Sequence, residues 1–359
     1  MRVTHIRVRS FRNLQDVIVE PGPDACVLYG SNAQGKTNFL EALYLLSNLQ
    51  SFRTHRISDL LPFGGSRSHI EADIEGELGR TRLLLVVESK GKRPSINGSS
   101  PHSTSEYLAE LPTIIFSPDD LSLAKGSQDL RRRYLDRATF LADPGHLESL
   151  RRYGRALRQR NAALRCVGGD LEVWDHQLAR YGAHVMRGRQ STLRRLQTTI
   201  QDLHRRLSGR NESLELDYRV KLEGKSAEEF LLDRLRATEE RDRRVGHTGV
   251  GPHRDGVSIR LGGRQADEHA SQGQLRTLAL GLKLSLLFWG REVRGVCPMF
   301  LLDDPGSELD AERLDALGSF LLDWPGQVII TGTSRSAVPL GGGRNSRYYR
   351  VEKGVIYPE

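Results

Sequence analysis

Cysteine, methionine and tryptophan are scarce in this sequence, and long apolar runs are missing from it. Its 359 residues include three cysteines, at positions 26, 166 and 297. This odd number of widely spaced thiols excludes a disulfide scaffold and a cysteine-based zinc site. It is typical of proteins in the reducing cytosol. No stretch approaches the roughly 20 consecutive apolar residues of a membrane helix, and the N-terminus alternates instead of forming a signal-peptide core. We therefore expect a cytoplasmic protein with no membrane partner.

Lysine is scarce as well, because 45 of the 53 basic residues are arginine. The net charge of +8 is a weak sign of an anionic partner, since an arginine bias can reflect genomic base composition. The location of the charge is more informative. Residues 131–210 hold 18 arginines, no lysine and 7 acidic residues, a net charge of +11 that leaves −3 for the rest. A positive charge concentrated in this way can hold a polyanion.

The length suggests two domains or lobes, and 38% hydrophobic residues are enough for a folded core. Three zones follow from composition and periodicity: 1–130, 131–245 and 246–359. Extended or apolar segments predict strands near the N-terminus and at 24–29, 82–88, 299–302 and 328–330, whereas 90–94 and 97–98 are predicted turns. The middle zone has helical periodicity, and a long helix is expected over 275–289. The C-terminal segment predicts a hairpin that turns at Lys353 and Gly354.

A phosphate-binding loop is the strongest motif. Residues 30–37, GSNAQGKT, match G-x-x-x-x-G-K-[ST] between a predicted strand and a predicted helix. Glycines let backbone N–H groups turn toward phosphate oxygens, and the helix N-terminus adds positive potential. Lys36, a predicted catalytic residue, is expected to meet the β- and γ-phosphates, and Thr37 to offer its hydroxyl to Mg²⁺. The predicted ATP-binding residues here are Gly30, Ser31, Asn32, Ala33, Gln34, Gly35, Lys36, Thr37 and Asn38.

Two carboxylates end an apolar strand 266 residues after Thr37, at Asp303 and Asp304. Because Mg²⁺ prefers oxygen ligands, Asp303 is the predicted metal residue. Asp304 is the predicted catalytic residue that polarises the attacking water. On their own, two such residues are more often a turn after a strand; the phosphate loop upstream favours the catalytic interpretation.

A second anion site is predicted upstream of this strand, at Ser271, Gln272, Gly273 and Gln274, just before the long helix. Serine and glycine at a helix N-terminus suit a phosphate, although serine is also a common helix cap. A second phosphate site in one chain is redundant unless it binds the nucleotide held by a second copy of the chain. The pattern thus favours an ATP-dependent homodimer with nucleotide between the copies.

These motifs, in this order, resemble ABC-type ATPases of the SMC-like branch, and more specifically the RecF family of bacterial recombination mediators. The segments that carry the resemblance, beside residues 303–304, are 11–14 (FRNL), 130–136 (LRRRYLD), 159–164 (QRNAAL), 251–255 (GPHRD) and 307–310 (SELD). The resemblance implies an α/β fold: an ABC-type P-loop ATPase head with a mixed sheet and a mainly helical inserted lobe. The first and third zones would form the head, and residues 131–245 the basic lobe.

Residue by residue, the resemblance implies further roles. Arg12 and Asn13 would lie near the nucleotide, Ser271 and Gly273 would touch the γ-phosphate across the dimer, and Asp310 would couple the two sites. It also implies slow, DNA-stimulated ATP hydrolysis with Mg²⁺. The expected partners are double-stranded DNA, single-strand/double-strand junctions, RecR and RecO, and indirectly RecA.

The sequence departs from the transporter relatives of this branch at two places. They carry glutamate where Asp304 stands, and a histidine where this chain has Thr331 and Thr333 after its last core strand. Which threonine senses the γ-phosphate stays open. Residues 117–120 lie where the branch places a metal-sensing loop, without its glutamine.

For DNA contact, Arg151, Arg155 and Arg158 share one helix face, and a merely solvated face is the equal alternative. Other functions left open are another SMC-like clamp with a different DNA role and a transporter ATPase subunit. A nuclease-linked ATPase and a non-hydrolysing structural protein are disfavoured, the first by the 56 residues that follow Asp303 and the second by the intact motifs.

Overall fold

The computed structural model describes residues 1–77, 79–166, 168–220, 222, 224–340 and 345–359. The chain forms two compact units. The first comprises Met1–Asp120, Arg206–Gly209 and Arg276–Glu359, and the second comprises Leu121–Arg205 and Arg210–Leu275. Residues 246–275, which we expected in the head, thus belong to the same unit as the helical lobe. No helix in these described ranges is both long and apolar enough to span a membrane.

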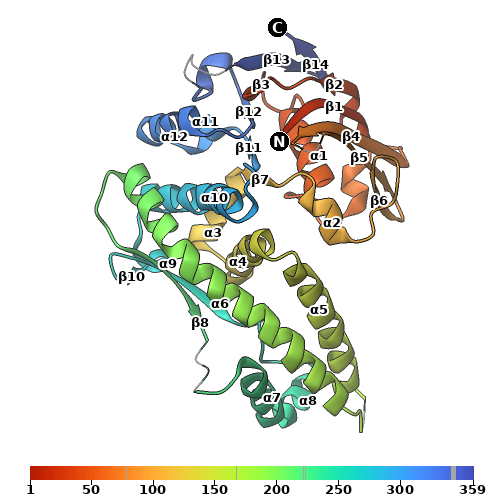
Figure 1. Ribbon diagram of the computed structural model, residues 1–359, viewed down its shortest axis with the longest axis vertical. Helices are drawn as coiled ribbons and strands as arrows, with labels where there is room; N and C mark the ends of the chain where they lie inside the picture. Colours follow the sequence, from red (N-terminus) through yellow and green to blue (C-terminus); the bar gives the residue numbers. More distant parts are fainter. Residues whose placement is uncertain (78, 167, 221, 223, 341–344) are drawn as a thin grey trace. The chain divides into compact units, whose positions relative to one another are not determined.

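The first unit is built around a six-stranded sheet in the order β14-β13-β3-β12-β11-β7 (Figure 1). All neighbours are parallel except the terminal hairpin. Its central strands are continuous apolar runs because both faces are covered. The strands are β3 (Ala25–Tyr29), β7 (Thr113–Phe116), β11 (Met299–Leu302), β12 (Val328–Gly332), β13 (Ser346–Glu352) and β14 (Val355–Pro358).

A second, antiparallel sheet of the first unit has the order β2-β1-β4-β5-β6. It contains β1 (Arg2–Phe11), β2 (Leu14–Val19), β4 (Arg67–Gly76), β5 (Gly79–Glu88) and β6 (Gly91–Ile96). The predicted turn at 90–94 is wrong beyond its first residue, because 91–96 form β6. Pro94 is tolerated there since β6 is an edge strand with one unpaired side.

Helices of the first unit connect and cover these strands. They are α1 (Lys36–Asn48), η1 (Ile57–Leu60), α2 (Thr104–Ala109), η2 (Pro118–Asp120), α11 (Pro305–Glu308), α12 (Ala311–Asp323) and η3 (Arg335–Ala337). Helix α10 (Gln272–Arg294) starts in the second unit and continues into the first. It contains the predicted helix over 275–289.

The second unit is mainly helical, with α3 (Leu121–Lys125), α4 (Gln128–Ala142), α5 (Gly145–Leu164), α6 (Glu172–Ser208), α7 (Ala227–Ala237), α8 (Glu239–Val245) and α9 (Ala266–His269). The helical periodicity of the middle zone corresponds in α6 to an apolar stripe that is buried at Leu193, Leu196, Ile200 and Leu203. A three-stranded antiparallel sheet joins the helices: β8 (Leu214–Arg219), β9 (Gly256–Leu261) and β10 (Arg264–Gln265). The lobe at 131–245 is mainly helical as expected, and β8, which was not predicted, is a strand within it with alternating burial.

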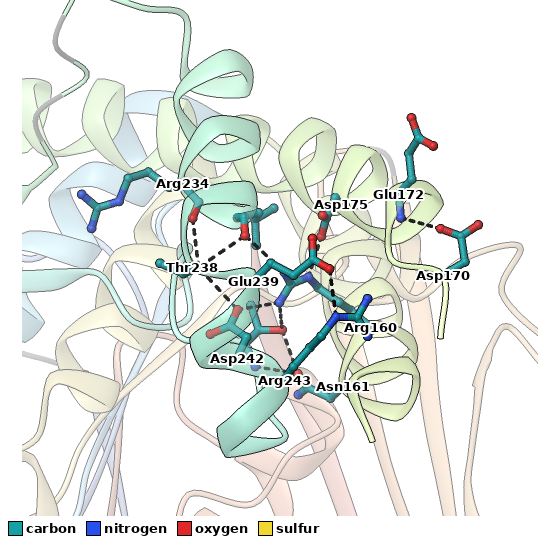
Figure 2. A network of polar contacts seen from close by, with 12 residues as sticks. Arg160, Asn161, Asp170, Glu172, Asp175, Arg234, Thr238, Glu239, Asp242 and Arg243 are labelled. Atoms are coloured by element: carbon teal, nitrogen blue, oxygen red, sulfur yellow. Dashed lines mark hydrogen bonds and ion pairs between the residues drawn. The ribbon is translucent and has the colours of Figure 1, made fainter. Parts of the chain in front are cut away.

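A buried charged centre holds the helices of this second unit together (Figure 2). Arg160 of α5 is fully buried and donates to Asp175 of α6 at 2.5 Å and to Asp242 of α8 at 2.7 Å. It also donates to the Thr248 hydroxyl at 3.0 Å, while Asn161 accepts from the Thr248 N–H. One arginine of α5 thus joins two other helices and the loop that follows α8, which contains Gly246, Gly249 and Gly251.

Candidate nucleotide site

The phosphate loop connects the buried strand β3 to α1, as predicted. Gly30 and Gly35 have φ angles of 149° and 117°, which side chains rarely adopt. A Cβ on Gly30 would collide with the Val351 carbonyl oxygen, so the strand end and β13 approach each other only with glycine here. The loop residues 31–33 are exposed, which leaves their backbone open to a ligand.

Lys36 folds back over this loop. Its Nζ donates to the carbonyl oxygens of Gly30 at 2.6 Å and Ser31 at 2.8 Å. Burial lowers the pKa of Lys36, and the nearby carboxylates of Asp304 and Asp303 oppose that shift. The ammonium therefore lies between the loop and the two acids, as a phosphate-binding cation requires.

Side chains distant in sequence hold the loop in shape. The amide of Asn13 donates to the Gln34 carbonyl at 3.4 Å and accepts from Asn38 at 2.7 Å. At the other side, the N–H groups of Lys353 and Gly354 donate to the side chain and backbone oxygens of Gln34, at 2.7 and 2.9 Å. The terminal hairpin, predicted to turn at these two residues, thus supports the loop directly.

Arg12, which was predicted to lie near the nucleotide, lies beside α1 and pairs with a carboxylate of the protein itself. It donates to Glu41 at 2.8 Å, and Glu41 is fully buried. Arg53, which the sequence analysis missed, pairs with the same Glu41 at 3.2 Å and donates to Asn38 at 2.8 Å. Its positive charge also lowers the pKa of Asp303, against the effect of burial. The signal that could have found it is the acidic Glu41 on an otherwise apolar helix face, which requires a cationic partner.

The acidic strand end meets the phosphate loop as predicted. The Thr37 hydroxyl donates to Asp303 Oδ1 at 2.8 Å, and the Thr331 hydroxyl lies 3.0 Å from the same oxygen. Burial raises the pKa of Asp303, while the hydrogen bonds from Thr37 and Thr331 oppose that shift. A hydroxyl and a buried carboxylate are hard oxygen ligands that suit Mg²⁺ with phosphate and water completing its shell. The donor set therefore fits this ion.

Asp304 is held at the strand end by its backbone. Its N–H donates to the Thr331 hydroxyl at 2.9 Å, and its φ of 46° is left-handed, an uncommon conformation for a non-glycine residue. Thr331 is thus buried against both acids, whereas Thr333 is exposed. Of the two threonines left open by the sequence, Thr331 supports the carboxylates and Thr333 is accessible to a ligand.

Asp310, the predicted coupling residue, caps α12 by accepting from the Arg313 N–H at 3.1 Å. The Arg313 guanidinium pairs with the same carboxylate and donates to the Thr277 hydroxyl of α10 at 2.7 Å. Asp310 itself remains half exposed. It is therefore fixed within its unit and available to a neighbour.

The predicted second anion site, Ser271 to Gln274, lies at the start of α10 in the second unit and is called the signature turn below. The Ser271 hydroxyl accepts from the Gln274 N–H at 3.2 Å, and the Gln274 side chain accepts from the Ser271 N–H at 2.9 Å, which is a capping box. Ser271 and Gln272 are exposed. The first unit therefore gathers the phosphate loop, both aspartates, Arg12 and Asn13, while the signature turn and the predicted DNA contacts belong to the second.

The fold and this site define a P-loop nucleotide-binding head of the ABC type. The family model "RecF/RecN/SMC N terminal domain" matches residues 2–356. The chain belongs to the RecF family, as its motifs predicted. It is 35% identical to DNA replication and repair protein RecF of Geobacter sp. (strain M21), over 99% of this chain and 100% of the relative. The corresponding protein of Anaeromyxobacter sp. (strain Fw109-5) is 38% identical, over 100% and 99%.

Solved structures agree with this assignment. "Structure of the recombination mediator protein RecF-ATP in RecFOR pathway" matches with a TM-score of 0.90 and 32% identity, over 100% of this chain and 99% of that one. An Smc head bound to a domain of ScpA matches with a TM-score of 0.58 at 14% identity, which is a likeness of fold alone. The predicted α/β ABC-type head with a helical lobe is confirmed.

Proposed function

We propose that this protein is an ATP-dependent DNA-binding protein of recombinational repair. ATP closes a dimer on duplex DNA near single-strand gaps, and slow hydrolysis, stimulated by DNA, reopens it. The observation that carries the proposal is the contact of Thr37 with Asp303 beside the phosphate loop, because it joins a phosphate cradle to a metal-ready carboxylate. The ATP-bound relative named above supports the same ligand.

In this function the loop residues bind the triphosphate through backbone N–H groups, and Lys36 exchanges its carbonyl partners for phosphate oxygens. Thr37 and Asp303 would hold Mg²⁺, which supplies charge neutralisation at the phosphates. Asp304 orients the attacking water and accepts its proton. Its short side chain reaches less far than glutamate, which agrees with slow turnover.

Dimer closure would place the signature turn of one copy on the nucleotide of the other. The exposed start of the 23-residue helix α10 offers N–H groups and the Ser271 hydroxyl to a γ-phosphate. Asp310 then couples the two sites from its fixed position at the start of α12. The free energy for closure is the preference of ATP for the dimer over the monomer.

For DNA, the best-supported surface is the outer face of α5. Arg151, Arg155 and Arg158 are exposed, while Tyr153 and Ala156 bury the opposite face. The contacts would be to phosphates, with little base readout and steep salt dependence. RecR and RecO are the proposed protein partners, with RecA loading as the outcome; the RecFOR pathway named for the solved relative supports this.

Sedimentation velocity tests the proposal. We expect a monomer with ADP and a dimer with ATP and Mg²⁺, and we expect Ser271→Arg to remain monomeric while still binding ATP. The same mass with both nucleotides, or normal dimerisation of Ser271→Arg, would contradict it. Duplex, single-strand and junction DNA titrations with and without ATP then identify the preferred substrate.

A further inference from the structure

The last residue of the signature turn reaches back into its own unit. Gln274 uses its side-chain oxygen for Ser271, and its side-chain nitrogen donates to both carboxylate oxygens of Glu212, at 3.3 and 3.2 Å. We propose that Glu212 is a positioning residue that fixes the signature turn for its partner's nucleotide. The inference rests on the proposed role of that turn in the dimer.

Glu212 is itself fixed to the long helix α6. Gln201 donates to the Glu212 carbonyl at 2.9 Å and accepts from the Leu214 N–H at 2.5 Å. One turn earlier, Gln197 donates to the Leu214 carbonyl at 2.5 Å and accepts from the Leu216 N–H at 3.0 Å. The two glutamines, four residues apart on one helix face, thus hydrogen-bond to the backbone of residues 212–216, much as a neighbouring strand would. The carboxylate that meets the signature turn is therefore connected rigidly to α6.

Two further side chains lie near the Glu212 carboxylate, both at longer distances than Gln274. His204 of α6 is fully buried, and its Nε2 lies 3.9 Å from Glu212. Burial lowers the pKa of His204 and the Glu212 carboxylate opposes that shift, while within the described residues neither ring nitrogen has a partner at hydrogen-bond distance. A neutral ring does not compete with Gln274 for the carboxylate as a charged one would. Arg210, at the surface, forms an ion pair with the same carboxylate at 3.8 Å.

This arrangement matters because a phosphate cap depends on geometry. The Ser271 hydroxyl and the first N–H groups of α10 must stand at fixed positions before a second copy arrives, since ordering them during association weakens binding. The capping box fixes the turn to its helix, and Glu212 fixes that helix start to the basic lobe. A displacement of α6 would accordingly reach the signature turn through side chains in direct contact.

A charge-swap cycle tests the inference through the ATP-dependent dimer dissociation constant. Gln274→Glu places two carboxylates together, and we expect dimerisation to weaken on the order of tenfold or more. Glu212→Gln keeps an acceptor and should weaken it about threefold. The double variant Glu212→Gln/Gln274→Glu restores the donor–acceptor pair with its ends exchanged, and glutamate still completes the capping box. We expect its dimerisation to return to within about threefold of the native chain.

Three controls make the result decisive. ATP binding to the monomer should be unchanged in all variants, and melting should show that each is folded. Glu215→Ala changes an exposed glutamate of β8 that lies three residues after Glu212 and opposite Arg260, and this variant should dimerise normally. A double variant no better than Gln274→Glu would overturn the inference, because Gln274 would then act on the nucleotide itself. If Ser271→Arg dimerised normally, the proposed function would fail instead, whatever the cycle showed.

Discussion

Replacement of the buried arginine of the helical lobe gives the most direct energetic test of this fold. In Arg160→Met the side chain keeps much of its volume, but Asp175 and Asp242, both nearly inaccessible to solvent, lose their shared cation. Removing one partner of a buried ion pair leaves uncompensated charge and typically costs about 3–5 kcal/mol. We expect a loss of that order in the free energy of unfolding of the lobe.

The sign of the pH dependence follows from Asp175. Burial raises its pKa in the folded chain even with Arg160 present. A carboxyl with a raised folded pKa favours folding below its ordinary pKa, and that contribution is lost as the pH rises through the folded value. Without the arginine the folded pKa rises further, so the penalty of Arg160→Met should be largest near neutral pH. It should shrink as the pH falls toward the raised pKa.

Urea titrations followed by far-ultraviolet circular dichroism, at neutral and mildly acidic pH, measure both effects. Arg158→Met on the exposed face of the same helix is the matched control and should change stability by no more than about 0.5 kcal/mol. A loss below about 1 kcal/mol for Arg160→Met, or a penalty that does not shrink at lower pH, would refute the reasoning.

Three further predictions concern function. Lys36→Met should abolish ATP binding in equilibrium dialysis, since the phosphates lose their central cation; retained affinity would place the triphosphate elsewhere. Asp304→Asn should bind ATP but stop hydrolysis and trap the dimer in sedimentation, and normal phosphate release would show that another group activates the water. Reversal of Arg151, Arg155 and Arg158 to glutamate should weaken binding to duplex DNA. It should also reduce the slope of log affinity against log salt concentration by about 3, since each lost phosphate contact accounts for about 0.9. Unchanged binding would show that the DNA surface lies on another face.

Much of the head could be predicted because its signals are local. The β3 strand, the loop and α1 follow from an apolar run, glycines and helical spacing within residues 25–48. The predicted strand at 299–302 agrees with β11 residue for residue. Two strands were missed. β6 contains a proline that its edge position tolerates, and an edge position cannot be read from the local sequence. β8, LELDYR, alternates apolar and charged residues, so its strand signal was present but short, and its partner β9 lies 37 residues further along the chain.

Within the site, the residues that could not be predicted from the sequence are those that act only on other side chains. Asp303 and Thr37 follow from motifs, but Thr331 is identified as the support of the acids only by its hydroxyl distances. Arg53 and Glu212 belong to no motif, and each is recognised by the partner it meets: Glu41 and Gln274 respectively. Such contacts join segments far apart in sequence, so they require the tertiary structure.

The division into two units assigns binding and coupling to different parts of the chain. The phosphate loop and both carboxylates lie in the first unit, while the signature turn and the basic face of α5 lie in the second. Changes at Glu212, Ser271 or the α5 arginines should therefore leave the monomer's affinity for ATP intact and act only on dimerisation or DNA binding. Changes at Lys36 should remove ATP binding, dimerisation and ATP-dependent DNA binding together, because ATP binding precedes the other two. A second-unit variant that lost nucleotide affinity in the monomer would show that both units form the ATP site together.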